Sequence, residues 1–95
     1  MSIKTRIEKK LWEIFSPSSL IVEDESYQHV NHGNYHPGGE SHFRVVIVSP
    51  MFRGCSRIVR HQKVYNCLEK ELKEGIHALC LKTLCPEEVE SGAPE

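Results

Sequence analysis

Residues 42–49, His-Phe-Arg-Val-Val-Ile-Val-Ser, are the stretch that decides the fold. Apolar side chains alternate along it, with Phe43, Val45 and Ile47 on one face and Val46 and Val48 on the other. Period-two alternation of branched and aromatic residues predicts a β-strand. Because the second half of this strand is apolar on both faces, we predict a position in the middle of a sheet.

Downstream of this strand the sequence predicts a turn and a helix. Pro50-Met-Phe-Arg-Gly54 has the composition of a turn. The helix begins at Ser56 or Arg57 and runs to Lys73, and Gly75 is placed to end it. Its apolar stripe, at helical spacing, consists of Val64, Leu68 and Leu72.

Three further elements complete the pattern. His77–Leu84 predicts the last strand, which Pro86 closes. Nearer the N-terminus, Leu20–Val22 predicts a short strand, and Ile3–Phe15 predicts an amphipathic helix that stops before Pro17. The apolar stripe of that helix consists of Ile3, Ile7, Leu11 and Ile14.

The predicted order is α-β-β-α-β. A strand–helix–strand connection within one sheet normally makes the two strands parallel, whereas the first two strands are most simply an antiparallel pair. We therefore predict an α+β fold: a two-layer domain with a three-stranded mixed sheet and the helices on one face. Residues 1–89 form this single domain, and residues 90–95 form a flexible C-terminal tail.

Composition is that of an ordinary globular protein. The chain has 95 residues, of which 39% are hydrophobic and 26% charged, with a net charge of −1. It contains no apolar run long enough to cross a bilayer and no signal-peptide core at its charged N-terminus. We expect a cytoplasmic protein, or a mitochondrial one if a transit segment has been removed. The four cysteines show no C-x-x-C spacing, so we interpret them as reduced, small apolar fillers.

The polar, glycine-rich segment Tyr27–Gly39 cannot pack a core and predicts a long loop. This segment carries three of the six histidines, at His29, His32 and His36. Imidazole changes charge near neutrality and is the commonest metal ligand in proteins. The loop histidines are therefore either solvent-facing residues or part of a metal site that takes another ligand from elsewhere in the chain.

Charge is distributed unevenly along the sequence. Between Glu40 and Glu69 there is no acidic residue. Four side chains that can carry positive charge gather at the start of the second helix, and we call them the basic helix start: Arg57, Arg60, His61 and Lys63. A helix N-terminus with cationic side chains attracts anions. This pattern indicates partner docking or phosphate contact, and the alternative is a solvated helix face.

Several motifs together resemble the BolA family. They are Glu40–Ser49, Phe52-Arg-Gly54, Arg60-His61, Val64-Tyr65 and Gly75–Leu79, followed by Thr83 and Pro86. The resemblance covers roughly residues 5–89 and implies a class II KH-like fold. It also implies an adaptor that partners a monothiol glutaredoxin and co-ligates a [2Fe-2S] cluster, with roles in iron–sulfur cluster assembly, trafficking and iron homeostasis. Some bacterial members are instead described as DNA-binding transcriptional regulators.

The resemblance also implies a ligand set. His77, in the Gly-x-His-Ala motif of the family, is one cluster ligand, and the second comes from the loop between the first two strands. This loop has no cysteine, so the chain resembles the histidine-loop subfamily, with His29 or His32 at the matching place and His36 in a part of variable length. A cluster needs four ligands. The glutaredoxin is expected to supply a thiolate and a glutathione thiol, so the chain alone is expected to be a monomer without a cofactor and to form a heterodimer with glutaredoxin.

The sequence motifs support nucleic-acid binding and catalysis less strongly than they support cluster binding. KH domains grip the nucleic-acid backbone with a Gly-x-x-Gly loop, but the turn from Phe52 to Arg57 contains one glycine. A DNA-binding regulator that uses the basic helix start is therefore our alternative function. We predict no enzyme activity, because Cys55, near Arg57 and His61 in sequence, is the one suggestive nucleophile and is more simply a surface thiol.

Overall fold

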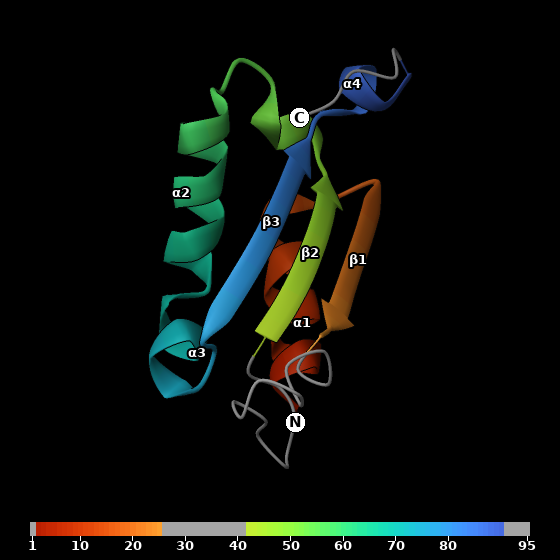
Figure 1. The fold of residues 1–95 in the computed structure, drawn as a ribbon. Coiled ribbons are helices and arrows are strands. Elements are labelled where there is room, and N and C mark those ends of the chain that lie inside the picture. Colours follow the sequence, from red (N-terminus) through yellow and green to blue (C-terminus); the bar gives the residue numbers. More distant parts are fainter. Residues whose placement is uncertain (1, 26–41, 91–95) are drawn as a thin grey trace.

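The computed structural model describes residues 2–25 and 42–90. The elements in chain order are α1 (Ile3–Phe15), β1 (Ser19–Asp24), β2 (His42–Val48), the short 3-10 helix η2 (Pro50–Phe52), α2 (Arg57–Cys67), α3 (Glu69–Glu74), β3 (Ala78–Leu84) and α4 (Pro86–Glu90). Figure 1 shows them as a ribbon. None of the helices in the described part of the chain is long and apolar enough to span a membrane.

The sheet has the predicted topology. Its strand order is β1-β2-β3, with β1 antiparallel and β3 parallel to the central strand β2. The register sets Val22 beside Val45 on one side and Val45 beside Leu81 on the other. The prediction that residues 42–49 lie in the middle of a three-stranded mixed sheet is therefore confirmed.

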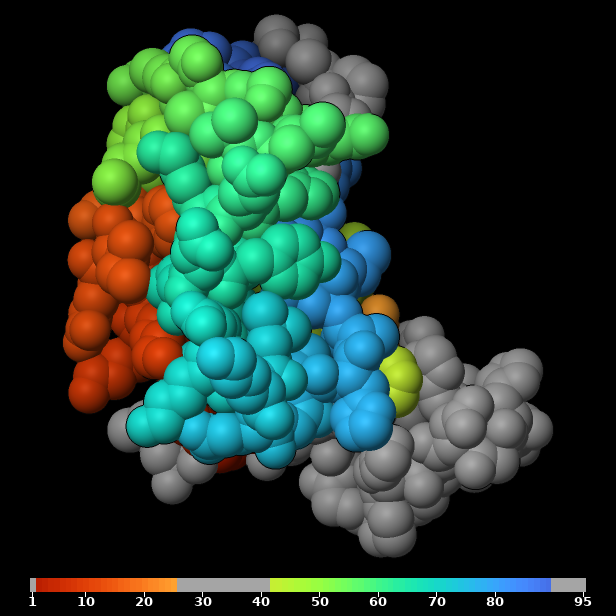
Figure 2. All heavy atoms as spheres, turned by 90° about the vertical axis from the view of Figure 1, so that its left-hand side faces the viewer, coloured from red at the N-terminus to blue at the C-terminus, as the bar shows by residue number. Residues whose placement is uncertain are grey.

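Helices and sheet form two layers (Figure 1). The core between them is made of side chains from the helices, from η2 and from the inner face of the sheet, including Ile7, Leu11, Phe15, Val22, Phe43, Val45, Ile47, Phe52, Val64 and Leu68. Viewed from the side of α2, the molecule presents α1 on one flank of that helix and β3 on the other (Figure 2). On the opposite face of the sheet, Ile21 is 47% exposed, so this face is open to solvent in the isolated chain.

Helix α1 has the predicted bounds, and its ends explain why. The Ser2 side chain accepts a hydrogen bond from the Thr5 backbone N–H, and Ser16 ends the helix in the left-handed conformation (φ 43°). The predicted stripe was wrong at its last member. Phe15 is 2% exposed and packs on Phe52, whereas Ile14 is 49% exposed, because a spacing of four residues from Leu11 stays closer to the buried face.

The second predicted helix is divided in two at Leu68, whose backbone (φ −102°, ψ 16°) departs from the helical values. The break turns α3 relative to α2, so that Glu71 is fully buried and Leu72 only partly. Glu71 accepts hydrogen bonds from Arg6 and Lys10 of α1, at 3.1 and 2.8 Å. A buried carboxylate needs such partners, and these contacts fix α3 against α1.

Helix α4 is an element that the sequence did not predict. Pro86 occupies its first position, where a missing N–H costs nothing. Glu88 reaches back to accept a hydrogen bond from the Cys85 backbone N–H at 2.8 Å, which caps the helix. The predicted tail overlaps α4 at residue 90, and residues 91–95 lie outside the described part of the chain.

Candidate metal centre

The parallel pairing of β2 and β3 brings two histidines together. In the register of these strands, His42 at the start of β2 is the partner of Ala78 at the start of β3. His77 directly precedes Ala78, and parallel strands have their N-terminal ends at the same end of a sheet. His77, which the resemblance singles out, is therefore a neighbour of His42, which the sequence analysis did not select.

The two imidazole rings lie face to face. Their centroids are 6.2 Å apart and their planes are inclined by 21°. His77 is exposed and His42 is partly buried, so at least one ring is open to solvent. We call His42 and His77 the imidazole pair. Both residues make interactions within the chain, and neither is a loose surface group.

The segment between β1 and β2 is anchored beside this pair. The Glu25 backbone N–H donates a hydrogen bond of 2.7 Å to the His42 carbonyl, which extends the β1–β2 ladder by one step. The chain therefore leaves the described part at Glu25 and re-enters it at His42, at the same end of the sheet as His77. The predicted ligands His29 and His32 lie outside the described residues, and so does His36.

The imidazole pair is not part of a larger group of metal-binding side chains in the described part of the chain. Among residues 2–25 and 42–90, no group of three or more His, Cys, Asp or Glu side chains is arranged to hold a metal ion. All four cysteines are free thiols; Cys80 is exposed and Cys85 is buried. A complete metal centre that uses the imidazole pair therefore requires ligands from outside these residues.

The basic helix start lies at the other end of the domain. Helix α2 follows η2, which comes directly after the C-terminal end of β2, and the helix then runs back along the sheet (Figure 1). Arg57 and Lys63 are exposed and His61 is partly buried. The structure therefore does not combine His77 and the basic helix start into one site.

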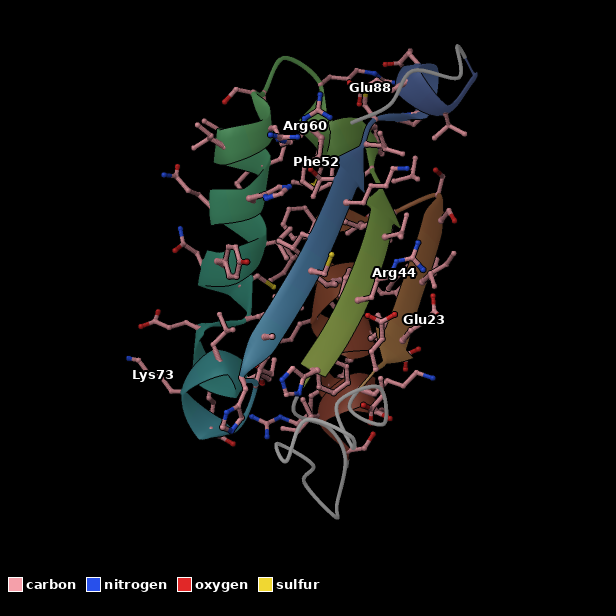
Figure 3. The ribbon with its side chains drawn as sticks, in the orientation of Figure 1. Glu23, Arg44, Phe52, Arg60, Lys73 and Glu88 are labelled. Carbon is pink, nitrogen blue, oxygen red and sulfur yellow. The ribbon has the colours of Figure 1, made fainter. Side chains whose placement is uncertain are left out.

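Arg60 has an internal role that distinguishes it from the other members of the basic helix start. It is 7% exposed, and it donates hydrogen bonds to the carbonyls of Cys55 (2.9 Å) and Thr83 (3.1 Å). It also binds the Glu88 carboxylate, with a shortest N–O distance of 2.6 Å. Figure 3 shows Arg60 and Glu88 together at the end of the domain that carries α4. This arrangement ties α2 to β3 and α4, so Arg60 is not available to contact a ligand without disturbing the fold.

The electrostatics of Glu88 reflect these contacts. The hydrogen bond from Arg60 is the largest cause, followed by the backbone hydrogen bond from Cys85, and together they lower the pKa of Glu88 to about 2. The pKa of Arg60 is raised, chiefly by the same hydrogen bond. The pair is therefore ionised throughout the neutral range.

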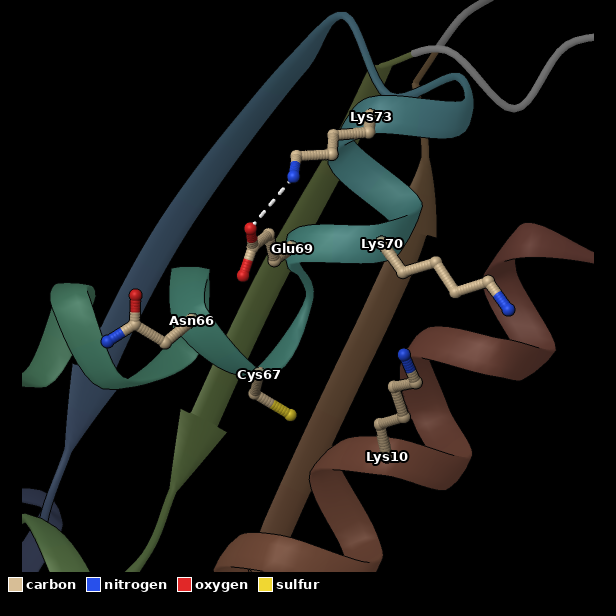
Figure 4. A pocket seen from close by; sticks show the side chains of 6 residues that line it. All are labelled: Lys10, Asn66, Cys67, Glu69, Lys70 and Lys73. Carbon is tan, nitrogen blue, oxygen red and sulfur yellow. Dashed lines mark hydrogen bonds and ion pairs between the residues drawn. The ribbon is translucent and has the colours of Figure 1, made fainter.

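A pocket of about 380 Å³ lies where α1, α2 and α3 meet, and its lining is Lys10, Asn66, Cys67, Glu69, Lys70 and Lys73 (Figure 4). Its cations are partly neutralised, since Lys73 binds Glu69 at 2.9 Å and Lys10 binds the buried Glu71 at 2.8 Å. Burial raises the pKa of the Cys67 thiol, so this thiol is a poor nucleophile or metal ligand at neutral pH. The pocket contains neither member of the imidazole pair.

Comparison with known proteins identifies the family. The family described as BolA-like protein matches residues 11–88, which is most of the chain.

The chain belongs to the BolA family. The DNA-binding transcriptional regulator BolA of Haemophilus influenzae is 46% identical over 88 residues, which cover 93% of this chain and 82% of the relative. Among solved structures, the BolA domain of SufE1 from Arabidopsis thaliana has a TM-score of 0.83 at 43% identity, and BolA1 from the same plant has a TM-score of 0.81 at 38% identity. Each comparison covers 93% of this chain and 96% of the other chain.

These similarities confirm both the family expected from the sequence motifs and its α+β fold with a three-stranded mixed sheet. They extend over the imidazole pair and the basic helix start alike, because the matched residues 11–88 include both. This BolA-family chain thus presents two separate candidate sites at opposite ends of its sheet.

Proposed function

We propose that this BolA-family protein is a non-catalytic adaptor that docks on a monothiol glutaredoxin and co-ligates a [2Fe-2S] cluster. In this proposal His77 is one ligand, and the second is His29 or His32 from the segment between β1 and β2. The glutaredoxin supplies a thiolate and a bound glutathione supplies a thiol. Such an adaptor would act in cluster assembly or trafficking and in iron homeostasis.

The observation that supports this proposal most directly is the position of His77. Its imidazole is exposed at the end of the sheet where the segment carrying His29 and His32 leaves and re-enters the described structure at Glu25 and His42. Imidazole is a suitable ligand for iron. Histidine ligation raises the reduction potential of a [2Fe-2S] cluster above that of an all-cysteine cluster, which suits a cluster that is passed on.

The available ligands favour a cluster that is shared with a partner protein over a cluster that this chain binds alone. A [2Fe-2S] cluster needs four protein or thiol ligands, and the described residues contain no group of three or more His, Cys, Asp or Glu side chains arranged to hold a metal. Thiolates, the commoner ligands of such clusters, would have to come from another molecule. The chemistry of the residues present therefore fits a cluster bridged between two partners.

Reconstitution of the mixed proteins tests this proposal. The chain, a monothiol glutaredoxin and glutathione are combined with iron and sulfide, and the charge-transfer bands of the mixed complex are recorded by absorption and circular dichroism. We expect His77→Ala to abolish or shift these bands, and one of the two substitutions His29→Ala and His32→Ala to do the same. Lys9→Ala, at an exposed position on α1, is the control and should leave the bands unchanged. Unchanged bands in His77→Ala would show that the ligand assignment is wrong.

A second function rests on the basic helix start. Arg57 and Lys63 are exposed at the beginning of a helix that has no acidic residue in its first turn, and the Haemophilus relative is named as a DNA-binding transcriptional regulator. For this alternative, duplex DNA affinity should fall steeply with salt. Arg57→Glu with Lys63→Glu should weaken binding and reduce the salt slope by about two, whereas Lys9→Glu on α1 should have a smaller effect. Arg60 is excluded from this test because its substitution would disturb the fold.

A further inference from the structure

We infer that His42 and His77 form a metal-binding site of their own in the chain without a partner, a bis-imidazole site for a single borderline divalent cation such as Zn²⁺. This site differs from the shared cluster site because its second ligand is His42, at the start of β2, rather than a loop histidine. The inference stands on the geometry of the imidazole pair. Only its consequence for cluster sharing rests on the proposed function.

The spacing of the two rings is close to that of two ligands of one ion. At the tetrahedral angle that Zn²⁺ prefers, a cation held about 2 Å from one nitrogen of each ring sets the two ring centres roughly 5 Å apart. The centroids of His42 and His77 are 6.2 Å apart. The two rings therefore have to approach each other by only about 1 Å to share one tetrahedral ion.

The ring orientations require at least one of the two side chains to rotate. The planes are inclined by only 21°, so both rings cannot aim a nitrogen lone pair at one ion as they stand. His77 is exposed and lies just outside β3, so its ring can turn about its side-chain torsions. The partly buried His42 lies at the strand end and supplies the more fixed donor.

The strand pairing makes the site preorganised. The backbone at His42 is held on one side by the partnership with Ala78 and on the other by the 2.7 Å hydrogen bond from Glu25. A ligand whose backbone is already fixed loses less conformational entropy when it binds an ion. Two imidazoles held in this way favour Zn²⁺, Cu²⁺ or Ni²⁺ over the oxygen-preferring Mg²⁺ and Ca²⁺.

Occupation of this site would affect cluster sharing. Zn²⁺ bound between the two imidazoles would use His77, which the proposed function assigns to the [2Fe-2S] cluster. The ion and the cluster would therefore exclude each other. Water would complete the coordination of the ion in the isolated chain, since no third protein donor of the described part lies within reach.

Zn²⁺ titration of the full-length chain tests the inference. The protein is labelled with ¹⁵N-histidine, so that each of the six imidazoles is followed separately by NMR. We expect the His42 and His77 imidazole signals to shift together with one apparent Kd. His42→Ala and His77→Ala should each weaken binding at least about tenfold, and the double variant should be no weaker than the poorer single variant.

Two further proteins serve as controls. His61→Ala should leave the Kd within about twofold, as should the triple substitution of His29, His32 and His36 by alanine. Loss of Zn²⁺ binding in the triple variant, or an unchanged Kd in His42→Ala, would overturn the inference. His42→Asn, compared by amide NMR with the parent protein, separates loss of the ligand from a local change of structure.

A second arm separates this inference from the proposed function. The glutaredoxin complex is reconstituted with and without Zn²⁺ present beforehand, and the yield of cluster is measured. Lower yield in the parent protein but not in His42→Ala supports both proposals. If the imidazole pair binds Zn²⁺ but the glutaredoxin complex forms its cluster without His77, the Zn²⁺ site is supported and the proposed function is wrong. Simultaneous tight binding of Zn²⁺ and cluster would disprove the exclusion.

Discussion

At the scale of single residues, the contacts of the Glu88 carboxylate strongly lower its own pKa. It receives hydrogen bonds from the Arg60 guanidinium and from the Cys85 backbone N–H, and its side chain is 30% exposed. Its pKa of about 2 lies below the ordinary value of 4.5. Because the folded-state pKa is the lower one, this group stabilises the fold fully above pH 4.5, and its contribution is lost as the pH falls toward 2.

Glu88→Gln should therefore change the acid stability of the protein. We expect the free energy of unfolding at pH 7 to fall by about 1–2 kcal/mol, after allowance for solvent screening. Between pH 4.5 and 2 the difference from the parent protein should shrink, because the parent loses the ionised carboxylate. Urea denaturation at several pH values measures this. Glu87→Gln removes a more exposed partner of Arg53 and should lower the free energy of unfolding less than Glu88→Gln does; equal losses in the two variants would contradict the special role of Glu88.

At the scale of secondary-structure elements, the contact between α1 and α3 depends on a buried charge. Glu71 of α3 is fully buried and binds Arg6 and Lys10 of α1, each at 2.8 Å. Burial acts against ionisation of Glu71, but the hydrogen bond from Lys10 and the charges of Lys10 and Arg6 outweigh it, so that its pKa is lowered. The break between α2 and α3 at Leu68 is what turns this carboxylate inward.

Glu71→Ala should destabilise the fold strongly, by about 3 kcal/mol, because it leaves two cations facing an emptied, buried position. Equilibrium unfolding in urea gives the value. Glu74→Gln is the matched control: Glu74 also binds Arg6, but its side chain is 42% exposed, and its loss should destabilise the fold much less than the loss of Glu71. A Glu71→Ala protein as stable as the control would show that hydrophobic packing alone holds α3 in place.

The sequence predicts an element well when the residues that determine the element lie within the same segment. Helix α1 and the central strand have strong periodicity and local stop signals, and both were predicted within a residue of their observed bounds. The break at Leu68 and the inward turn of Glu71 depend on cations on α1, more than 60 residues away in sequence. Helix α4 depends on the reach of Arg60 to Glu88. Periodicity in a single segment carries no information about such distant partners.

At the scale of the whole molecule, the two candidate sites lie at opposite ends of the sheet (Figure 1). Helix α2, 11 residues long, separates the basic helix start from the end of the domain that carries His77. The resemblance selected His77, but His42 was missed. The sequence did contain a signal for His42. Each of the two strands that are predicted to be parallel begins next to a histidine, and parallel strands begin at the same end of a sheet.

The separation of the two ends predicts that they respond independently. Arg57→Glu with Lys63→Glu should leave the imidazole signals of His42 and His77 and their Zn²⁺ affinity unchanged within about twofold, since exposed charges this far apart are largely screened at physiological salt. Histidine-selective NMR of the double variant measures this. The reciprocal control, His77→Ala, should leave the salt dependence of any DNA binding unchanged. Coupled changes at both ends would indicate a conformational link across the sheet.

The hydrogen bond between Glu25 and His42 has a consequence for how this protein can be altered. It holds Glu25 and His42 side by side, so the fold itself keeps together the two ends between which a segment is inserted. Doubling a flexible loop costs only roughly 0.6 kcal/mol. Segments of different length or with different metal-binding side chains can therefore be grafted between these two residues, and the domain should accept new donor chemistry without being redesigned.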